Sequence, residues 1–364
     1  MPIRKVVTAF IKSFYGMLPA WVTSMHVEVL PAQTYLYDLP TNFDHLPAHF
    51  AKQYVRQLTI SSKKIFLLSN VFATWQGMVF KNMRIFIPSL QTPELENYFV
   101  EPVLLKQWSA TAIHLTQEEG VAIAHSQYAP ENYYHWILDT LPRLLLLRQH
   151  YPGIAVIVLE PANDFVKVTL AALGFDNIVP VNKKQLLRIN KLILPELLSP
   201  SGHVNPIQVR LVRDELINKL GTQITTTTAA PSRKVYISRA RQQRRKVANQ
   251  SELDELLLSH NFETIYFEEL SLSQQIAVMQ ETAVLLSMHG ANIVNLIFLG
   301  PTAKVIELVS EKLHNPAYWR LSAVFSLPYY VLPCKTVQPE EVSWHSNTDI
   351  LVDINSLENI LLSL

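Results

Sequence analysis

The sequence predicts an α/β protein made of two Rossmann-like domains that face one another across a cleft. Short apolar runs typical of buried strands alternate with helical patterns in two separate stretches of the chain, and this alternation implies parallel sheets. The chain has 364 residues, which is more than one hydrophobic core usually supports. A threonine-rich stretch without apolar periodicity, residues 221–232, separates the two stretches, as expected of a linker.

The first half is expected to begin with strands and turns and to continue as alternating strands and helices. Short apolar runs broken by Asn, Gly and Pro cover residues 65–121. Residues 121–125 then have the pattern of a buried strand and residues 133–150 that of a helix, for which Asn132 is a suitable N-cap. Further strands are expected at residues 154–160 and 177–181, and further helices at residues 165–175 and 205–220; residues 191–198 form another apolar run between them.

The second half repeats this alternation. Strands are expected at residues 233–239, 263–270, 283–288 and 303–309, and helices at residues 250–262, 272–282 and 289–298. These patterns place an N-terminal domain at residues 1–220, a second domain at residues 233–335 and a C-terminal extension at residues 336–364.

Charge, cysteine content and hydropathy restrict the partners and the location. The 31 basic and 30 acidic residues leave a formal net charge of +1, so no general attraction to nucleic acid is expected. The single Cys334 excludes an internal disulfide and suits a reducing compartment. No apolar run reaches the roughly 18 residues of a membrane-spanning helix. We therefore expect a cytoplasmic protein.

An amphipathic pattern marks the N-terminus. Apolar residues recur at helical spacing over residues 3–14, beside the basic Arg4, Lys5 and Lys12. Lys12 interrupts the apolar run and no small-residue cleavage site follows, so the segment is not interpreted as a cleaved signal. Two interpretations stay open: a helix packed on its own domain, the commoner meaning of such a pattern, and a peripheral contact with the inner face of a membrane.

Several motifs that would define the chemistry are absent. No two glycines lie two residues apart, so G-x-G-x-x-G is missing, as are the P-loop lysine motif and G-x-S-x-G. No Asp-x-Asp pair is present to hold a metal beneath a pyrophosphate. The spacing of His125, His135 and His289 fits no standard set of metal ligands. We therefore expect no metal site and no cofactor, so that helix N-termini and arginines would bind any nucleotide.

His135 and Asp139 are candidate catalytic residues. Residues four apart on a helix share one face, with Cβ atoms about 5–6 Å apart, so the two side chains can touch. Asp139 would orient the imidazole and stabilise its charged form, which makes His135 a general base near neutral pH. Asp139 as the base itself is one alternative. A polar pair satisfied within an aromatic core is the other, because Tyr133, Tyr134 and Trp136 surround it in the sequence.

Residues that follow strands in the second half are candidates for anion binding. His289 and Gly290 lie where a buried strand turns into a helix, whose free N–H groups attract anions. The alternative is that Gly290 serves only the turn and that Asn292 only caps the helix. Arg239 follows a strand directly, and a basic run continues to Arg245.

Arginines bind phosphate oxygens through two donors at once, so this loop could neutralise a pyrophosphate, although a solvated basic loop is the commoner meaning. Glu307 ends a strand, a position from which a carboxylate accepts ribose hydroxyls in α/β folds.

In their order, these segments resemble the family 61 glycosyltransferases over roughly residues 120–309. The segment NYYHWILDTLPRL is similar to the family's Asn-x-x-His-x-x-x-Asp pattern; YISR with the RRKVAN run, NFETIYFEELSLSQQI, and MHGANIVNLIF with KVIEL complete the set. The resemblance implies a GT-B fold with the acceptor half first and the nucleotide-sugar half second. It also implies an inverting, metal-independent transfer from a nucleotide-sugar donor, in our expectation a UDP-sugar, to a glycan or other hydroxyl acceptor.

Carried over residue by residue, the resemblance assigns Asn132, His135 and Asp139 to the acceptor-side catalytic segment. Gln250 stands where the family usually has glutamate, and Asn292 follows His-Gly-Ala where a small residue is common; both departures bear on the choice of donor. A non-catalytic sugar- or nucleotide-binding relative and a metal-dependent hydrolase remain as alternatives. The resemblance assigns these residues to donor binding: Arg239, Arg245, Asn249, His289, Gly290, Ala291, Asn292 and Glu307.

Overall fold

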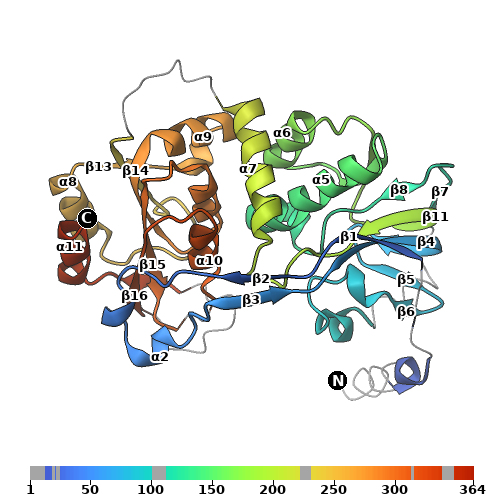
Figure 1. The fold of residues 1–364 in the computed structure, drawn as a ribbon, viewed down its shortest axis with the longest axis horizontal. Helices are drawn as coiled ribbons and strands as arrows, with labels where there is room; N and C mark the ends of the chain where they lie inside the picture. The colour runs from blue at the N-terminus through green and yellow to red at the C-terminus, as the bar shows by residue number, and fades with distance from the viewer. Residues whose placement is uncertain are drawn as a thin grey trace. The chain divides into compact units, whose positions relative to one another are not determined.

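The computed structural model describes residues 13–18, 21, 25–100, 112–221, 231–312, 315–337 and 348–364. The chain forms two compact α/β units (Figure 1). The first unit comprises Met1–Gln33 and Thr59–Val212, and the second comprises Thr34–Leu58 and Arg213–Leu364. The second unit therefore includes an N-terminal segment, Thr34–Leu58, that the division expected from the sequence places in the first domain.

Two of the expected features lie mostly outside the described residues. These are the N-terminal amphipathic segment, of which residues 1–12 are not described, and the linker, of which residues 222–230 are not described. Within the part of the chain that the structure describes, no helix is long and apolar enough to cross a membrane.

The first unit is built on a mixed sheet of nine strands with the main order β10-β9-β8-β11-β4-β5-β6. Its parallel part is the alternating region expected from the sequence, and its antiparallel part is the strand-and-turn region. The parallel strands are β8 (Val121–Ala122), β9 (Ala155–Leu159), β10 (Ile178–Val181) and β11 (Leu186–Pro195); the others are β1 (His26–Leu30), β4 (Lys63–Thr74), β5 (Val79–Lys81), β6 (Arg84–Ile85) and β7 (Ala112–Leu115), the last of which pairs parallel with β11.

Burial explains why the central strand of this parallel part is continuously apolar. All five residues of β9 are buried, as expected of a strand covered on both faces. Helix α5 (Leu141–His150) packs against β11. Helix α6 (Asp164–Ala172) follows β9 and ends before Gly174, whose φ of +74° suits the left-handed turn that commonly closes a helix. The long α7 (Pro206–Leu220) contains the boundary between the two units.

The second unit has a six-stranded sheet with the order β13-β12-β14-β15-β16-β17. Every neighbouring pair is parallel except β16 with β17. Counted from β12, the first five strands follow the order 2-1-3-4-5 of doubly wound folds, in which ligands bind at the switch point beside the first strand. The strands are β12 (Arg233–Ile237), β13 (Phe262–Ile265), β14 (Thr282–Met288), β15 (Lys304–Ser310), β16 (Tyr329–Thr336) and β17 (Ile350–Leu351).

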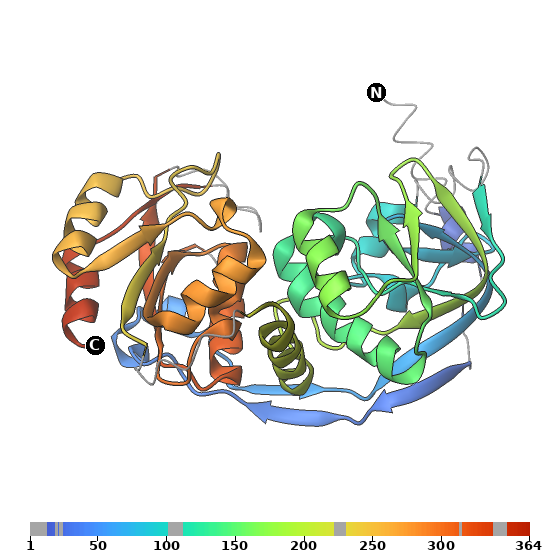
Figure 2. The ribbon, with the colours of Figure 1, turned by 90° about the horizontal axis from the view of Figure 1, so that it is seen from above.

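Helices cover both faces of this second sheet (Figure 2). The apolar residues of α8 (Gln250–Ser259) and α11 (Ile354–Leu362) form one core cluster with the strands. The other helical elements are α9 (Leu272–Glu281), η6 (Ala291–Phe298) and α10 (Ala317–Val324), and η6 packs against both α9 and α10. The helix expected at residues 289–298 is a 3-10 helix in the structure, beginning at Ala291.

Residues Thr34–Leu58 pack on the strands and helices of the second unit. The Asn42 side chain pairs with the backbone of Val331 in β16, donating to its carbonyl at 2.9 Å and accepting from its N–H at 3.1 Å. The indole N–H of Trp319 donates to the Asp38 carbonyl at 2.7 Å, and the Tyr54 ring stands edge-on to Trp319 with centroids 5.1 Å apart. The segment contains η1 (Phe43–His45) and α2 (Ala48–Ala51), and the boundaries between the two units fall within β2 (Gln33–Leu36) and β3 (Gln57–Ile60).

Candidate active site

The helix that carries His135 and Asp139 is capped as the sequence predicts. The side chain of Asn132 accepts a hydrogen bond from the Tyr134 N–H at 3.0 Å, which confirms Asn132 as the N-cap. The helix is not regular, however. A short α-turn, α4 (Tyr133–His135), leads into a π-helical turn, Trp136–Thr140, before α5 begins at Leu141. Such turns are often found at functional sites.

A proline explains part of this irregularity. Pro142 has no N–H to donate to the carbonyl four residues before it, so the α-helical pattern of hydrogen bonds cannot run unbroken through this turn. The π-helical turn contains Asp139 and directly follows His135. The helix expected over residues 133–150 is therefore present, but its turn at residues 136–140 is π-helical.

His135 and Asp139 are in direct contact. His135 Nδ1 lies 2.7 Å from Asp139 Oδ2, with side chains that are 16% and 5% exposed. The rings of Tyr128 and Tyr134 flank the imidazole, with centroids 5.4 Å and 5.1 Å away. The pair thus joins a buried carboxylate to a partly exposed imidazole, in aromatic surroundings.

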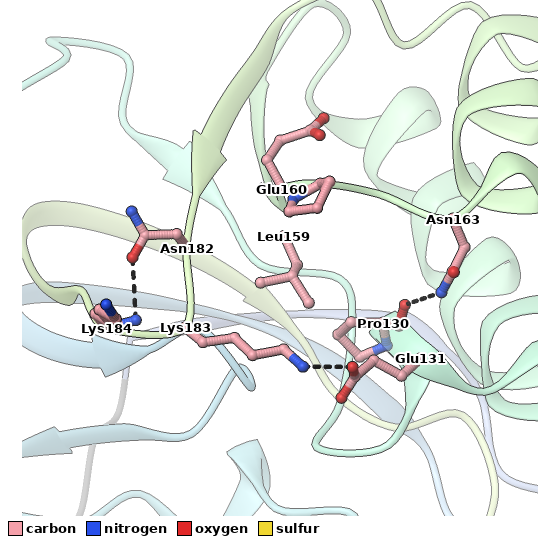
Figure 3. Close-up of a pocket in the computed structure, with 9 residues that line it drawn as sticks. Pro130, Glu131, Leu159, Glu160, Asn163, Asn182, Lys183 and Lys184 are labelled. Carbon is pink, nitrogen blue, oxygen red and sulfur yellow. Dashed lines mark hydrogen bonds and ion pairs between the residues drawn. The ribbon is translucent and has the colours of Figure 1, made fainter.

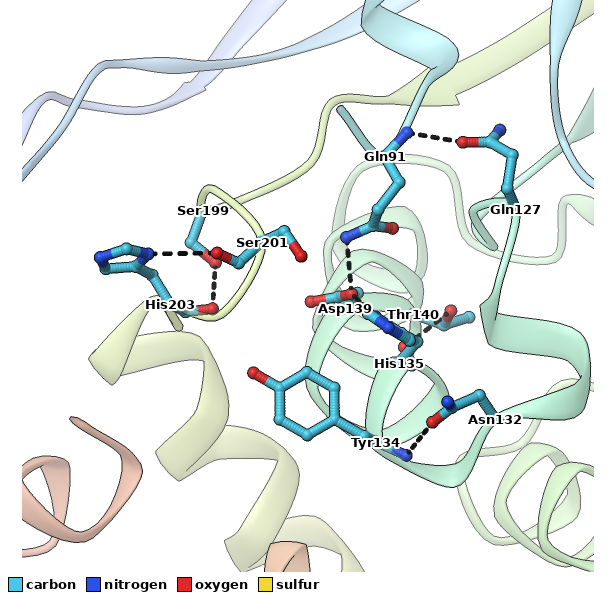
Figure 4. Close-up of polar contacts among 10 residues, drawn as sticks. All are labelled: Gln91, Gln127, Asn132, Tyr134, His135, Asp139, Thr140, Ser199, Ser201 and His203. Atoms are coloured by element: carbon cyan, nitrogen blue, oxygen red, sulfur yellow. Dashed lines mark hydrogen bonds and ion pairs between the residues drawn. The ribbon is translucent and has the colours of Figure 1, made fainter. Parts of the chain in front are cut away.

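Two glutamines that the sequence did not single out lie behind Asp139 (Figure 4). Gln91 Nε2 donates to Asp139 Oδ2 at 3.0 Å, and the backbone N–H of Gln91 donates to Gln127 Oε1 at 2.6 Å. Gln91 is 48 positions from Asp139 in the chain. No local pattern of residues could have revealed a contact over that separation.

A buried arginine adds positive charge near Asp139. Arg143, at 2% exposure, donates through its guanidinium to the Pro195 carbonyl at the end of β11. Burial lowers the pKa of Arg143 to about 10, and the charges of Asp139 and Glu196 oppose this shift. Arg143 therefore remains a cation at neutral pH and places a positive charge close to Asp139.

A cavity of about 490 Å³ opens at the carboxyl ends of β9 and β10 in the same unit (Figure 3). Its wall includes Glu160 after β9, Asn182 after β10, and an ion pair between Lys183 and Glu131 at 2.5 Å. Glu131 directly precedes Asn132, so the cavity reaches the start of the helix that carries His135.

In the second unit, residues at the switch point converge. Arg239 follows β12, and Gly290 follows β14, the neighbouring strand. A Cβ atom added at Gly290 would lie 2.5 Å from Arg239 Nη1. The absence of a side chain at Gly290 therefore lets the Arg239 guanidinium lie against the backbone. This contact explains why a glycine is needed here better than the turn alone does.

The Arg239 guanidinium is held by the loop that follows it. Its Nε donates to the Arg245 carbonyl at 3.1 Å and its Nη2 to the Arg244 carbonyl at 3.3 Å. Burial, followed by repulsion from Arg245, lowers the pKa of Arg239. The loop itself takes a left-handed conformation at Arg245, with φ of +57°. A cation disfavoured in this way would be stabilised by a bound anion.

His289 and Glu307 form a second histidine–carboxylate pair. His289 Nδ1 lies 2.6 Å from Glu307 Oε1, and the Tyr329 hydroxyl donates to Glu307 Oε2. Burial, followed by the charge of Glu307, raises the pKa of Tyr329, which keeps this hydroxyl a donor. Both carboxylate oxygens are thus engaged within the protein, and the Tyr318 ring packs against His289 with centroids 5.0 Å apart.

The remaining donor-side candidates have different surroundings. Asn249 pairs with the backbone of Val352, donating to its carbonyl at 2.9 Å and accepting from its N–H at 3.0 Å. Ala291 and Asn292 begin η6, whose N-cap position is Gly290, and no side chain caps this helix. The reading of Asn292 as a mere cap is therefore wrong, and Asn249 tethers the C-terminal extension.

No group of three or more His, Cys, Asp or Glu side chains among the described residues is arranged to hold a metal ion. His125, one of the histidines considered as a ligand, is buried, and its Nε2 lies 2.8 Å from the Trp75 carbonyl.

The family profile described as Glycosyltransferase 61 matches residues 133–306. Residues 133–306 of this chain belong to glycosyltransferase family 61. A stretch of 95 residues, 26% of the chain, is also 30% identical to a rice protein (Oryza sativa subsp. japonica), "Beta-1,2-xylosyltransferase RCN11", and spans 16% of that protein's length.

The family 61 segment includes both candidate sites. It contains His135 and Asp139 in the first unit, and Arg239, His289 and Gly290 in the second. Asn132 and Glu307 lie one residue outside its two ends. The resemblance noted from the sequence is confirmed, and the matched segment contains the first histidine–carboxylate pair and the histidine of the second.

Proposed function

We propose that the chain transfers a sugar from a nucleotide-sugar donor, a UDP-sugar, to a hydroxyl of a glycan or similar acceptor. The observation that carries this proposal is the 2.7 Å contact between His135 and the buried Asp139 inside the family 61 segment. The activity in the name of the rice protein, a beta-1,2-xylosyltransferase, supports a sugar transfer.

His135 acts as the general base. Asp139 is acceptor-only when ionised, so it holds the imidazole with the Nδ1 proton directed at its carboxylate and leaves Nε2 as the basic atom. Nε2 takes the proton of the acceptor hydroxyl while that oxygen attacks the anomeric carbon. The bond from the anomeric carbon to the diphosphate breaks on the opposite face, so the configuration inverts.

The imidazole is the better candidate for the base than the carboxylate. The Asp139 side chain is more buried than that of His135, and its Oδ2 already accepts from both Gln91 and His135. A base has to come within hydrogen-bonding reach of the hydroxyl it deprotonates, which favours the more exposed of the two groups.

The second unit binds the nucleotide diphosphate. Negative charge develops on the leaving diphosphate, and preorganised donors stabilise such charge strongly. Arg239, Arg245 and the turn at His289 to Ala291 meet at the switch point, the usual ligand position of this topology. Glu307 has both oxygens engaged, so it orients His289 in this scheme and is a poorer ribose ligand than its strand position indicates. In this scheme arginines take the place of a metal, and the fold class that we propose is GT-B.

The test measures activity and stability on the same variants. A thermal-shift panel of nucleotide sugars selects the donor, and release of the nucleoside diphosphate with and without EDTA measures turnover. His135→Ala should abolish turnover and leave nucleotide affinity near the wild-type value. Asp139→Asn should lower turnover by a factor on the order of 10²–10⁴, the span of general acid–base catalysis.

The control is His150→Ala, which removes an exposed histidine from the same helix. Variants at His135 and Asp139 that melt early but turn over normally per folded molecule would show a core polar pair instead. Loss of wild-type turnover in EDTA, with recovery on adding manganese, would refute the metal-independent scheme.

A further inference from the structure

The carboxylate of Asp139 is fixed from two sides. Oδ2 accepts from His135 Nδ1 at 2.7 Å and from Gln91 Nε2 at 3.0 Å (Figure 4). An amide nitrogen can only donate, and the reversed amide would set its oxygen against the carboxylate oxygen. The negative charge of the Asp139 carboxylate therefore determines that the nitrogen of the Gln91 amide, and not its oxygen, faces it. The Gln91 side chain is itself buried.

Gln91 is in turn held by Gln127. The Gln91 backbone N–H donates to Gln127 Oε1 at 2.6 Å, and Gln127 Nε2 donates to the Ser89 carbonyl at 2.9 Å. Both glutamine side chains and Asp139 are buried. The Gln127 side chain therefore holds the backbone at Gln91 and Ser89, and so fixes the position from which the Gln91 side chain reaches Asp139.

We propose that Gln91 is a positioning residue for the His135 base. It fixes the Asp139 rotamer so that Oδ2 faces His135 Nδ1, which keeps the neutral imidazole in the tautomer with its proton on Nδ1 and its lone pair on Nε2. Without Gln91 the carboxylate is free to rotate, and the ring loses its fixed partner. The inference rests on the proposed role of His135 as the base.

The test replaces the donor without removing much volume. Gln91→Met keeps an unbranched side chain of similar length but cannot donate to Asp139. Gln127→Met leaves the Gln91 amide intact and removes its support, so it provides a milder second variant if Gln91→Met does not fold. Gln208→Met is the matched control, because Gln208 is a buried glutamine of the same unit on α7.

Two readouts separate positioning from stability. Nitrogen-15 NMR of the histidine rings in the free protein reports the tautomer of His135, and release of the nucleoside diphosphate reports turnover. We expect one tautomer in the wild type and a mixture in Gln91→Met, with turnover reduced about 10- to 100-fold, as for a displaced catalytic group. Gln127→Met should change both in the same direction by less, and Gln208→Met should change neither.

Other outcomes overturn the inference. Folded Gln91→Met with the wild-type tautomer, or with turnover within about twofold of wild type, would show that Gln91 only fills space. An equal loss in Gln208→Met would show a general effect of destabilisation. A wild type without transfer to any acceptor refutes the proposed function, whereas the tautomer measurement still shows separately whether Gln91 holds the pair.

Discussion

Each unit contains a histidine bonded to a more deeply buried carboxylate. The His135 and Asp139 side chains are 16% and 5% exposed, and those of His289 and Glu307 are 15% and 3% exposed. In both pairs Nδ1 faces the carboxylate, which determines the ring nitrogen that is left for another partner. In the proposed function, the same local arrangement supports a base in one unit and an anion contact in the other.

Gly290 offers a test of the Arg239 position. Gly290→Ala places a Cβ 2.5 Å from Arg239 Nη1, so the guanidinium has to move, while the glycine's own backbone tolerates a side chain. We expect UDP to bind more weakly, by up to about 1.5–3 kcal/mol, which is the contribution of a hydrogen bond to a charged group. The loss of affinity in Arg239→Ala sets the upper limit. Isothermal titration measures both.

Gly300→Ala is the matched control for this substitution. Its Cβ would meet only the Pro231 side chain, at an ordinary 3.5 Å, so nucleotide affinity should stay at the wild-type value. If Gly290→Ala bound UDP as tightly as the wild type does, Arg239 would not be part of the donor site.

His125 makes the first unit sensitive to acid. Burial lowers its pKa from 6.5 to about 4, so below pH 6.5 the unfolded chain binds a proton that the folded chain does not. Stability is therefore full above pH 6.5 and falls as the pH drops toward 4, by up to about 3 kcal/mol. His125→Gln keeps a donor for the Trp75 carbonyl without titrating, and should reduce the fall in melting temperature between pH 7.5 and pH 5.

The exposed His150 provides the comparison. His150→Gln should leave the acid sensitivity of the melting temperature as in the wild type. A His125→Gln variant that loses as much stability in acid as the wild type would assign the effect to other groups.

At the scale of elements, two asparagines join segments far apart in the chain through the same geometry. Asn42 pairs with both backbone groups of Val331, and Asn249 with both backbone groups of Val352. In each contact, a side-chain amide makes the pair of hydrogen bonds that a neighbouring strand would otherwise make with that residue's backbone. The C-terminal extension, with β17 and α11, is thereby fastened next to the loop that follows β12.

Asn249→Ala should therefore lower the stability of the protein and leave its affinity for the donor nucleotide unchanged. Loss of both bonds to Val352 leaves buried backbone groups unpaired, at a cost of about 1–3 kcal/mol. We expect a lower melting temperature and faster hydrogen exchange in α11, with UDP affinity near wild type. Arg239→Ala should show the reverse pattern. Loss of nucleotide affinity in stable Asn249→Ala would instead restore Asn249 to the donor site.

At the scale of the whole molecule, the second unit depends on a segment from near the start of the chain. Thr34–Leu58 belongs to it, and Tyr54 packs there against Phe43, Phe50 and Trp319. The second unit is thus not encoded by a continuous stretch. Any truncation that removes these early residues removes part of its core.

Tyr54→Ala tests this dependence. Truncating a buried aromatic ring costs about 3–5 kcal/mol, and the loss should fall on the second unit. Hydrogen exchange should quicken in β15, β16 and α10 and stay unchanged in β9 and α5. Val55→Ala, at a neighbouring side chain that is 60% exposed, should change neither. Faster exchange in the first unit alone would contradict this assignment.

The sequence by itself determined the local structure. Strand and helix periodicity predicted most elements from β9 to β15, the Asn132 cap was confirmed, and the i, i+4 spacing of His135 and Asp139 predicted a contact that the structure contains. These features depend on residues a few positions apart, and backbone geometry alone relates such residues.

Only the tertiary structure decided the rest. Gln91 meets Asp139 across 48 positions, Tyr329 meets Glu307 across 22, and Asn249 meets Val352 across 103. The Arg239 guanidinium lies on Gly290, and Thr34–Leu58 joins the second unit. Periodicity reports which face of an element is buried, but not which element covers it. Contacts between elements are selected by the packing of the complete core, so they appear only when the chain is folded.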